Sequence, residues 1–152
     1  MYGVPADLDL NFFHAATLIQ ICVGVSEMIF HFHSADLGAP NNLGTISVHG
    51  GGWQLLDADG QQLDGKPEPP PAEVRPLHVL LEGGARLLEA HGANPERPPL
   101  RVHRLLGLRV VGTTVSAPRW IALTFENGDV LRILDDSEQF ESFSIHPGDV
   151  FI

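Results

Sequence analysis

The sequence predicts a mainly β fold (α+β) in which two related antiparallel meanders pack as a sandwich or a partly open barrel. Short segments rich in β-branched and aromatic residues alternate apolar with polar positions, which is typical of strands with one buried face. Turn signals separate these segments, among them the Asn127-Gly128 pair between two alternating runs. The same apolar pattern also occurs twice, and one small meander alone would be marginal.

The internal repeat aligns residues 11–34 with residues 104–127 at a constant offset, so that Leu18 falls over Val111 and Cys22 over Val115. The apolar pairs that follow are Met28 with Ile121, Phe30 with Leu123, Phe32 with Phe125 and, after a short insertion in the first copy, Ile46 with Leu131 and Val48 with Ile133. We therefore expect the apolar faces of the two copies to form one core.

The first copy, residues 11–57, is expected to hold three or four strands. The segment TLIQICV, residues 17–23, is short and rich in β-branched residues. Residues 28–32 alternate apolar with polar side chains, and residues 45–48 form the returning strand. The sequence Asp-Ala-Asp-Gly at 57–60 predicts a turn.

The second copy, residues 101–152, repeats this order. We expect strands over residues 109–115, 121–125 and 130–134, and a hairpin turn at Glu126 to Asp129 between the last two. A final strand is expected at Phe143 to Ile145.

A proline-rich connector, residues 58–100, is expected between the copies. The run GKPEPPP, residues 65–71, cannot join a central strand because proline lacks the backbone donor. Helically spaced leucines between residues 76 and 91 predict one short helix, which Gly83-Gly84 interrupts. The length of 152 residues fits one domain, residues 1–152.

The charge distribution indicates the class of partner. The formal net charge is −10, no Lys or Arg precedes Lys66, and the last segment, residues 133–152, is acidic. A protein that binds nucleic acid needs a basic contact face, so this class is excluded. An acidic surface favours a partner protein with a basic surface.

The single cysteine, Cys22, cannot form an intramolecular disulfide, which favours the cytoplasm. The N-terminus lacks the basic and apolar regions of a signal peptide. The longest apolar stretch, residues 12–25, is too short and too polar to span a membrane. The sequence therefore predicts a cytoplasmic protein without membrane contacts.

The second copy also carries a recognisable pattern. Residues 105–145 resemble a family of small bacterial proteins of unknown function, which end in a strand, an NG-type turn, a strand, D-D-S, an aromatic-E-S-F motif and a strand. Here Phe140 stands where tyrosine is more usual, and residues 51–65 resemble the middle of the same family. Similar small β-rich proteins occur in toxin–immunity gene neighbourhoods, so the resemblance implies an immunity-type protein without catalytic residues.

The acidic cluster Asp135-Asp136-Ser137-Glu138 has two interpretations. Its oxygen atoms could hold a hard cation, but it lacks the spacing and central glycine of a calcium loop. Asp and Ser also close turns by bonding to their own backbone, and this interpretation is favoured. The aligned residues of the first copy, His49 to Gly52, keep a turn without acids.

Acidic side chains and an aromatic anchor are the candidates for partner binding. The residues expected in this role are Asp135, Asp136, Glu138, Glu141 and Trp120. An exposed tryptophan beside an arginine, here Arg119, is a common anchor of protein interfaces, although core packing is the default for tryptophan.

A metal site formed by His31, His33 and His49 is an alternative. On a strand, His31 and His33 point to the same face, and two imidazoles can share a zinc ion if a third ligand arrives. His49 or Asp36 could supply that ligand. The aligned Thr124 and Glu126 of the second copy favour a plain solvent face instead.

The favoured function is therefore a non-enzymatic acidic protein-binding module, such as an immunity-type inhibitor of a bacterial toxin, with no cofactor. One alternative is a metal-dependent or small-ligand-binding enzyme that uses His31, His33 and His49. Another is a homodimeric assembly protein that pairs through the apolar C-terminal segment, residues 143–152, or through Trp120.

Overall fold

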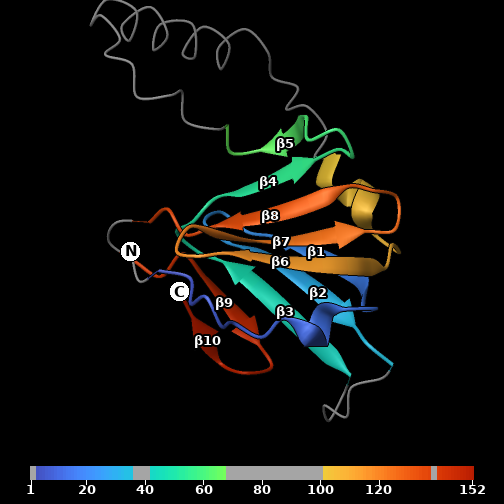
Figure 1. The fold of residues 1–152 in the computed structure, drawn as a ribbon. Coiled ribbons are helices and arrows are strands. Elements are labelled where there is room, and N and C mark those ends of the chain that lie inside the picture. The colour runs from blue at the N-terminus through green and yellow to red at the C-terminus, as the bar shows by residue number, and fades with distance from the viewer. Residues whose placement is uncertain (1–2, 36–41, 68–100, 138–139) are drawn as a thin grey trace, which may run out of the picture. The chain divides into compact units, whose positions relative to one another are not determined.

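The computed structural model describes residues 3–35, 42–67, 101–137 and 140–152. These residues form ten strands in two five-stranded antiparallel sheets, so the predicted mainly β class is confirmed (Figure 1). Sheet A contains, in spatial order, β1 (Thr17–Val23), β2 (Met28–His33), β3 (Leu43–Val48), β9 (Phe143–His146) and β10 (Val150–Phe151). Sheet B contains β5 (Gln62–Gly65), β4 (Trp53–Leu56), β8 (Val130–Leu134), β7 (Trp120–Phe125) and β6 (Val110–Ser116). Two short 3-10 helices, η1 (Asn11–Phe13) and η2 (Arg101–Leu105), precede the two meanders.

The repeat appears in the structure as two equivalent halves that exchange their last hairpins. Strands β1, β2 and β3 form one meander, and β6, β7 and β8 form the other. The hairpin β4–β5 then leaves the first meander and pairs with β8, whereas β9–β10 leaves the second and pairs with β3. Each sheet is therefore built from both copies, which joins the two halves into one unit.

The predicted alignment of the repeat is wrong by one residue in its first strand. Leu18 pairs with Phe32, and Val110 pairs with Phe125, so Leu18 corresponds to Val110 and not to Val111. A β-bulge follows each of these buried residues and turns the next side chain outward, leaving Ile19 48% and Val111 49% exposed. Counted between equivalent residue pairs of the two hairpins, the connection after this strand is one residue longer in the second copy than in the first. An alignment without a gap that fits the later strands is therefore shifted by one residue in the first strand.

One side of the sandwich is partly closed by the two halves themselves. The N–H of Leu18 donates to the carbonyl of Leu108 over 3.1 Å, and the N–H of Val110 donates to the carbonyl of Ala16 over 2.8 Å. The N–H of Ala15 also donates to the carbonyl of Val110. These bonds join the start of β1 to the start of β6, so the two sheets are hydrogen-bonded to each other along this edge.

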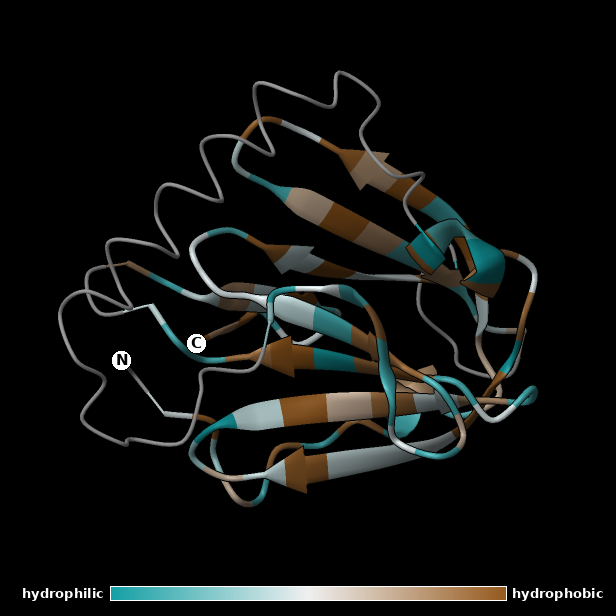
Figure 2. Cartoon of the chain, turned by 90° about the horizontal axis from the view of Figure 1, so that it is seen from above, coloured by the Kyte–Doolittle hydropathy of each residue, from teal (hydrophilic) through white to brown (hydrophobic). Residues whose placement is uncertain are grey.

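The apolar faces of both sheets meet in one core, as the repeat predicts. Phe30, Phe32, Leu123 and Phe125 are fully buried and belong to a single cluster of core side chains. Figure 2 shows the alternation of apolar and polar residues along the strands that creates these faces. Phe13 from η1 joins the cluster, with its ring centroid 5.1 Å from that of Phe32.

The predicted turns are present, but the first copy extends further than expected. Gly128 has a φ of +89° in the Asn-Gly turn, and Gly60 has a φ of +82° in the turn after β4. Strand β5 lies inside the segment 58–100 that was predicted as a connector, because residues 62–65 return along β4.

The described residues belong to one compact unit. The predicted connector helix falls within residues 68–100, which lie outside the described residues, and a single domain over 1–152 stays a prediction. No helix in the part of the chain that the structure describes is long and apolar enough to cross a membrane.

Candidate functional site

The two hairpin exchanges cross at one end of the sandwich. Residues 49–52 lead from β3 to β4, and residues 135–142 lead from β8 to β9 (Figure 1). The N–H of Gly51 donates to the carbonyl of Ser142 over 3.1 Å, and the N–H of Leu134 donates to the carbonyl of Gly52 over 2.8 Å. A Cβ atom at Gly51 would lie 2.4 Å from the carbonyl oxygen of Leu134, so this crossing requires glycine.

The acidic cluster holds this crossing together. Asp135 is only 3% exposed, and its carboxylate accepts one hydrogen bond from the Ser142 hydroxyl over 2.6 Å and one from the N–H of Gly3 over 2.8 Å. Asp136 accepts a bond from the N–H of Gly52 over 2.8 Å and forms an ion pair with Lys66. The two aspartates therefore bind backbone N–H groups and side chains of the chain itself.

These contacts correct part of the expected partner-binding set. A buried Asp135 with both oxygens engaged is not available to a partner, and the part-exposed Asp136 is paired with Lys66. Glu141 is exposed, while Glu138 lies outside the described residues. A role of Glu141 in binding stays a prediction.

Trp120 is half-buried and contacts an arginine other than the predicted one. The guanidinium carbon of Arg132, on the neighbouring strand β8, lies 4.6 Å from the centre of the Trp120 ring. Such a contact is favourable in itself, because the face of the indole attracts a cation. Arg119 is exposed. Trp120 as an interface anchor stays a prediction.

The structure separates the three histidines of the alternative metal site. His31 and His33 share the outer face of β2, where Nε2 of His31 lies 3.6 Å from the sulfur of Cys22. His33 pairs with Leu43 at the start of β3, whereas His49 follows the far end of that strand. The described residues contain no group of three potential ligands that could hold a metal ion. His49 therefore lies away from His31 and His33 along β3, and Asp36, the other possible third ligand, lies outside the described residues, so the metal-site alternative stays a prediction.

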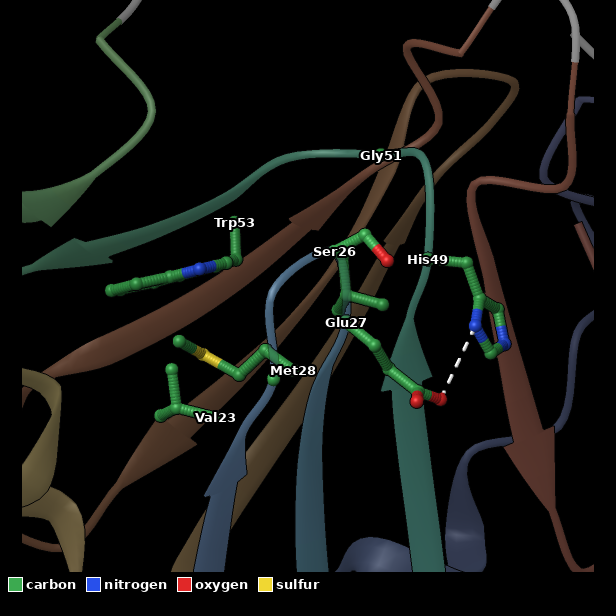
Figure 3. A pocket seen from close by; sticks show the side chains of 9 residues that line it. Val23, Ser26, Glu27, Met28, His49, Gly51 and Trp53 are labelled. Carbon is green, nitrogen blue, oxygen red and sulfur yellow. Dashed lines mark ion pairs between the residues drawn. The ribbon is translucent and has the colours of Figure 1, made fainter.

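A pocket of about 210 Å³ opens at the same end of the sandwich, in the first half. Its walls come from the turn between β1 and β2, from the residues after β3 and from the start of β4. The side chains of Val23, Met28 and Trp53 gather on one side, and Glu27 points toward His49 on the other (Figure 3). The pocket therefore combines an apolar wall with a polar rim.

The corresponding place in the second half lies between the turn from β6 to β7 and the residues after β8, and the chain's own N-terminal segment contacts both. Val4 is only 3% exposed and packs in the core, and its N–H donates to the carbonyl of Pro118, in the turn, over 3.0 Å. Gly3 donates to Asp135, directly after β8. The two halves thus differ at this end, because a segment covers the second and a pocket opens in the first.

The rim of the pocket exposes aliphatic side chains. Val25, at the tip of the turn between β1 and β2, is fully exposed, and Val23 is 53% exposed. Glu27 and His49 have side chains that are 42% and 40% exposed. Among the described residues that line the pocket, none is Lys or Arg. The open end therefore presents apolar surface beside one carboxylate.

Beside the rim, His49 contacts Ser144 by a hydrogen bond and Glu27 as an ion pair. Nε2 of His49 lies 3.2 Å from the Ser144 hydroxyl, and Nδ1 lies 3.3 Å from the Glu27 carboxylate. This is the order of groups in a serine hydrolase, where histidine activates the hydroxyl. Ser144, however, is only 3% exposed and sits in β9 between β3 and β10. A nucleophile must reach the substrate, so this geometry favours a structural role.

We expect a fluorophosphonate probe to leave Ser144 unlabelled, since its hydroxyl is buried beneath His49. Peptide mass spectrometry after prolonged incubation measures this, with a known serine hydrolase as the positive control. Labelling of Ser144 that disappears in His49→Ala would contradict the structural reading and indicate an activated nucleophile.

No protein-family model, no curated protein and no solved structure matches the chain. The resemblance of residues 105–145 to a family of small bacterial proteins therefore stays a prediction. Of the residues that line the pocket, the sequence singled out only His49 as a candidate site residue, and it did so as a metal ligand.

Proposed function

We propose that the protein is a non-enzymatic binding module that receives part of a partner protein at the open end of its first half. The observation that carries this proposal is the difference between the halves. A buried side chain of the chain itself, Val4, covers the end of the second half, while the first half keeps a pocket with an apolar wall and a polar, exposed rim. Exposed apolar surface rimmed by polar residues is characteristic of interaction sites.

Charge favours a partner with a basic surface. Among the described residues that line the pocket, Glu27 supplies a carboxylate and none is Lys or Arg, and Glu141 is exposed on the neighbouring crossing segment. The net charge of −10 adds a field that steers a basic protein toward this chain. A toxin inhibited by an immunity-type protein is a partner of this kind, and a cytoplasmic site of action is compatible with the half-buried, unpaired Cys22.

Self-association through β10 is a second candidate, favoured by one observation. This strand forms the edge of sheet A, and Phe151 is 54% exposed there. An unpaired edge with an exposed aromatic residue is able to pair with another chain. Ile152, by contrast, is 1% exposed and bonds to Phe143, so most of the apolar terminus is used within the chain.

We expect Val23→Asp to weaken binding of the cognate partner about 10- to 100-fold, since desolvating an aliphatic side chain contributes about 1.5–3 kcal/mol. The matched control is Val111→Asp. Val111 is exposed to nearly the same extent, 49% against 53%, but lies at the far end of its strand from the crossing. Proteins encoded beside this gene are the first partners to test, by calorimetry.

Equal affinity of the two variants would contradict the proposed site. The midpoint of denaturant unfolding of each variant shows whether a loss of binding reflects a loss of folding.

A further inference from the structure

We infer that the pocket takes an extended peptide segment of a foreign partner, with a β-branched aliphatic residue that enters the pocket and a basic residue beside it. This inference rests on the proposed function and names the chemistry of its partner. The template is the chain itself, because the second half already holds such a segment at the corresponding place.

The template is Gly3-Val4, which lies across the end of the second half. Val4 donates its N–H to the carbonyl of Pro118, and Gly3 donates its N–H to the carboxylate of Asp135. The Val4 side chain enters the core and is 3% exposed. An aliphatic side chain held by two backbone hydrogen bonds is thus the occupant that this end of the fold accepts.

The corresponding elements of the first half offer a similar apolar wall, although the residues aligned with the acidic cluster of Asp135, which are His49 to Gly52, carry no carboxylate. The turn from β1 to β2 replaces the turn from β6 to β7, and Val48, the last residue of β3, pairs with β2 as Ile133 of β8 pairs with β7. Trp53 begins β4 as Phe143 begins β9. The apolar wall is therefore preserved between the halves, and the difference is that, within the part of the chain that the structure describes, no segment covers the first half.

The volume fits one aliphatic side chain with part of its backbone. An apolar protein cavity of about 150 Å³ accommodates a benzene molecule, and this pocket measures about 210 Å³. Trp53 forms the wall, and its ring stands edge-on to Phe30 at a centroid distance of 6.4 Å. A valine or isoleucine would contact the indole and Met28 without displacing the core.

The charge of the polar rim favours a basic residue next to the aliphatic residue of the peptide. In the second half, the carboxylate that receives the segment is Asp135, which is buried and engaged. In the first half, the carboxylate at the rim is Glu27, which is 42% exposed and has His49 as its neighbour at 3.3 Å. A Lys or Arg beside the aliphatic residue would place its cation near the Glu27 carboxylate, in a lining whose described residues include no Lys or Arg.

A foreign partner is favoured over the N-terminal segment of a second copy. That segment is already used within its own chain, since Val4 is buried and Gly3 is hydrogen-bonded to Asp135. Its release would expose a core side chain and leave the Asp135 carboxylate without one donor. An independent segment binds without this loss.

The test uses the full chain with Trp120→Phe, which leaves Trp53 as its only tryptophan. The probe is the peptide acetyl-Lys-Gly-Val-Pro-Ala-amide, titrated while Trp53 emission is recorded. We expect a saturable change, at least about 10-fold weaker binding when valine in the peptide is replaced by aspartate, and weaker binding when lysine is replaced by glutamate. Val23→Asp in the protein should abolish the change, whereas Val111→Asp should not.

Three results would overturn the inference. One is the absence of any response at millimolar peptide, and another is equal binding of the valine and aspartate peptides. The third is a dimer seen by light scattering that disappears in Val4→Asp, which would identify a second copy as the occupant. A protein partner that binds in a Val23-dependent way while the peptide does not would leave the proposed function standing and refute only this occupant.

Discussion

Phe125→Ala is expected to lower the free energy of unfolding by about 3–5 kcal/mol, the usual cost of removing a buried aromatic side chain. Phe125 is fully buried at the end of β7, where it pairs with Val110 of β6. The loss combines the transfer free energy of the ring with the cavity that remains, because β6 is held in place by its bonds to the first half.

Denaturant unfolding followed by circular dichroism measures this loss. The control is Phe140→Ala, since Phe140 is 70% exposed and its removal should change stability by less than about 0.5 kcal/mol. A loss below about 1 kcal/mol for Phe125→Ala would show that the two halves do not share one core.

Asp135→Ala is expected to be the most damaging change of an acidic residue. It would remove the acceptor of the Ser142 hydroxyl, which is fully buried, and of the N–H of Gly3. Each donor left without a partner costs about 1–3 kcal/mol. The N-terminal segment and the crossing of the hairpins would both be loosened, because this one carboxylate holds them together.

Glu141→Ala is the matched control, because Glu141 is an exposed acid on the same crossing segment. We expect it to change stability by less than about 0.5 kcal/mol. Similar, small losses in both variants would contradict the structural role of Asp135 and would restore it as a candidate for partner binding. Thermal and denaturant unfolding should agree on the ranking.

The strands could be predicted because their signals are local. The alternation of Met28, Phe30 and Phe32 and the Asn127-Gly128 turn each report the structure of a few neighbouring residues. The bulges at Ile19 and Val111 could not be predicted, since an extra residue in an apolar strand leaves the composition unchanged. Only the pairing partner shows that the side chain has turned outward.

The exchange of hairpins between the two halves could not be predicted from the sequence either. A strand such as β4 has the same pattern whether it returns to β3 or crosses to β8, because either neighbour supplies the same backbone bonds and an apolar face. The crossing is instead specified by contacts distant in sequence. One is the approach of Gly51 to Leu134, and another is the bond from Gly52 to Asp136.

The candidate site shows the same limit for charged residues. The sequence identified Asp135 and Asp136 as a cluster and favoured a local turn, whereas their observed bonds go to Gly3, Ser142 and Gly52, which are more distant in sequence. The sequence also predicted that these aspartates bind a partner, because a run of acidic residues does not show which of its side chains are buried. The pocket beside Trp53 was missed because it forms between the β1–β2 turn, the residues after β3 and the start of β4, which only the fold brings together.

Site-specific photo-crosslinking tests the central claim most directly. A photoreactive amino acid at position 25, the fully exposed tip beside the pocket, is compared with one at position 151 on the edge strand β10. In cells that express the neighbouring genes, we expect a discrete adduct with a partner protein from position 25, which is lost when Val23→Asp is added. Adducts only from position 151, or adducts from position 25 that persist in Val23→Asp, would contradict binding at the open end of the first half.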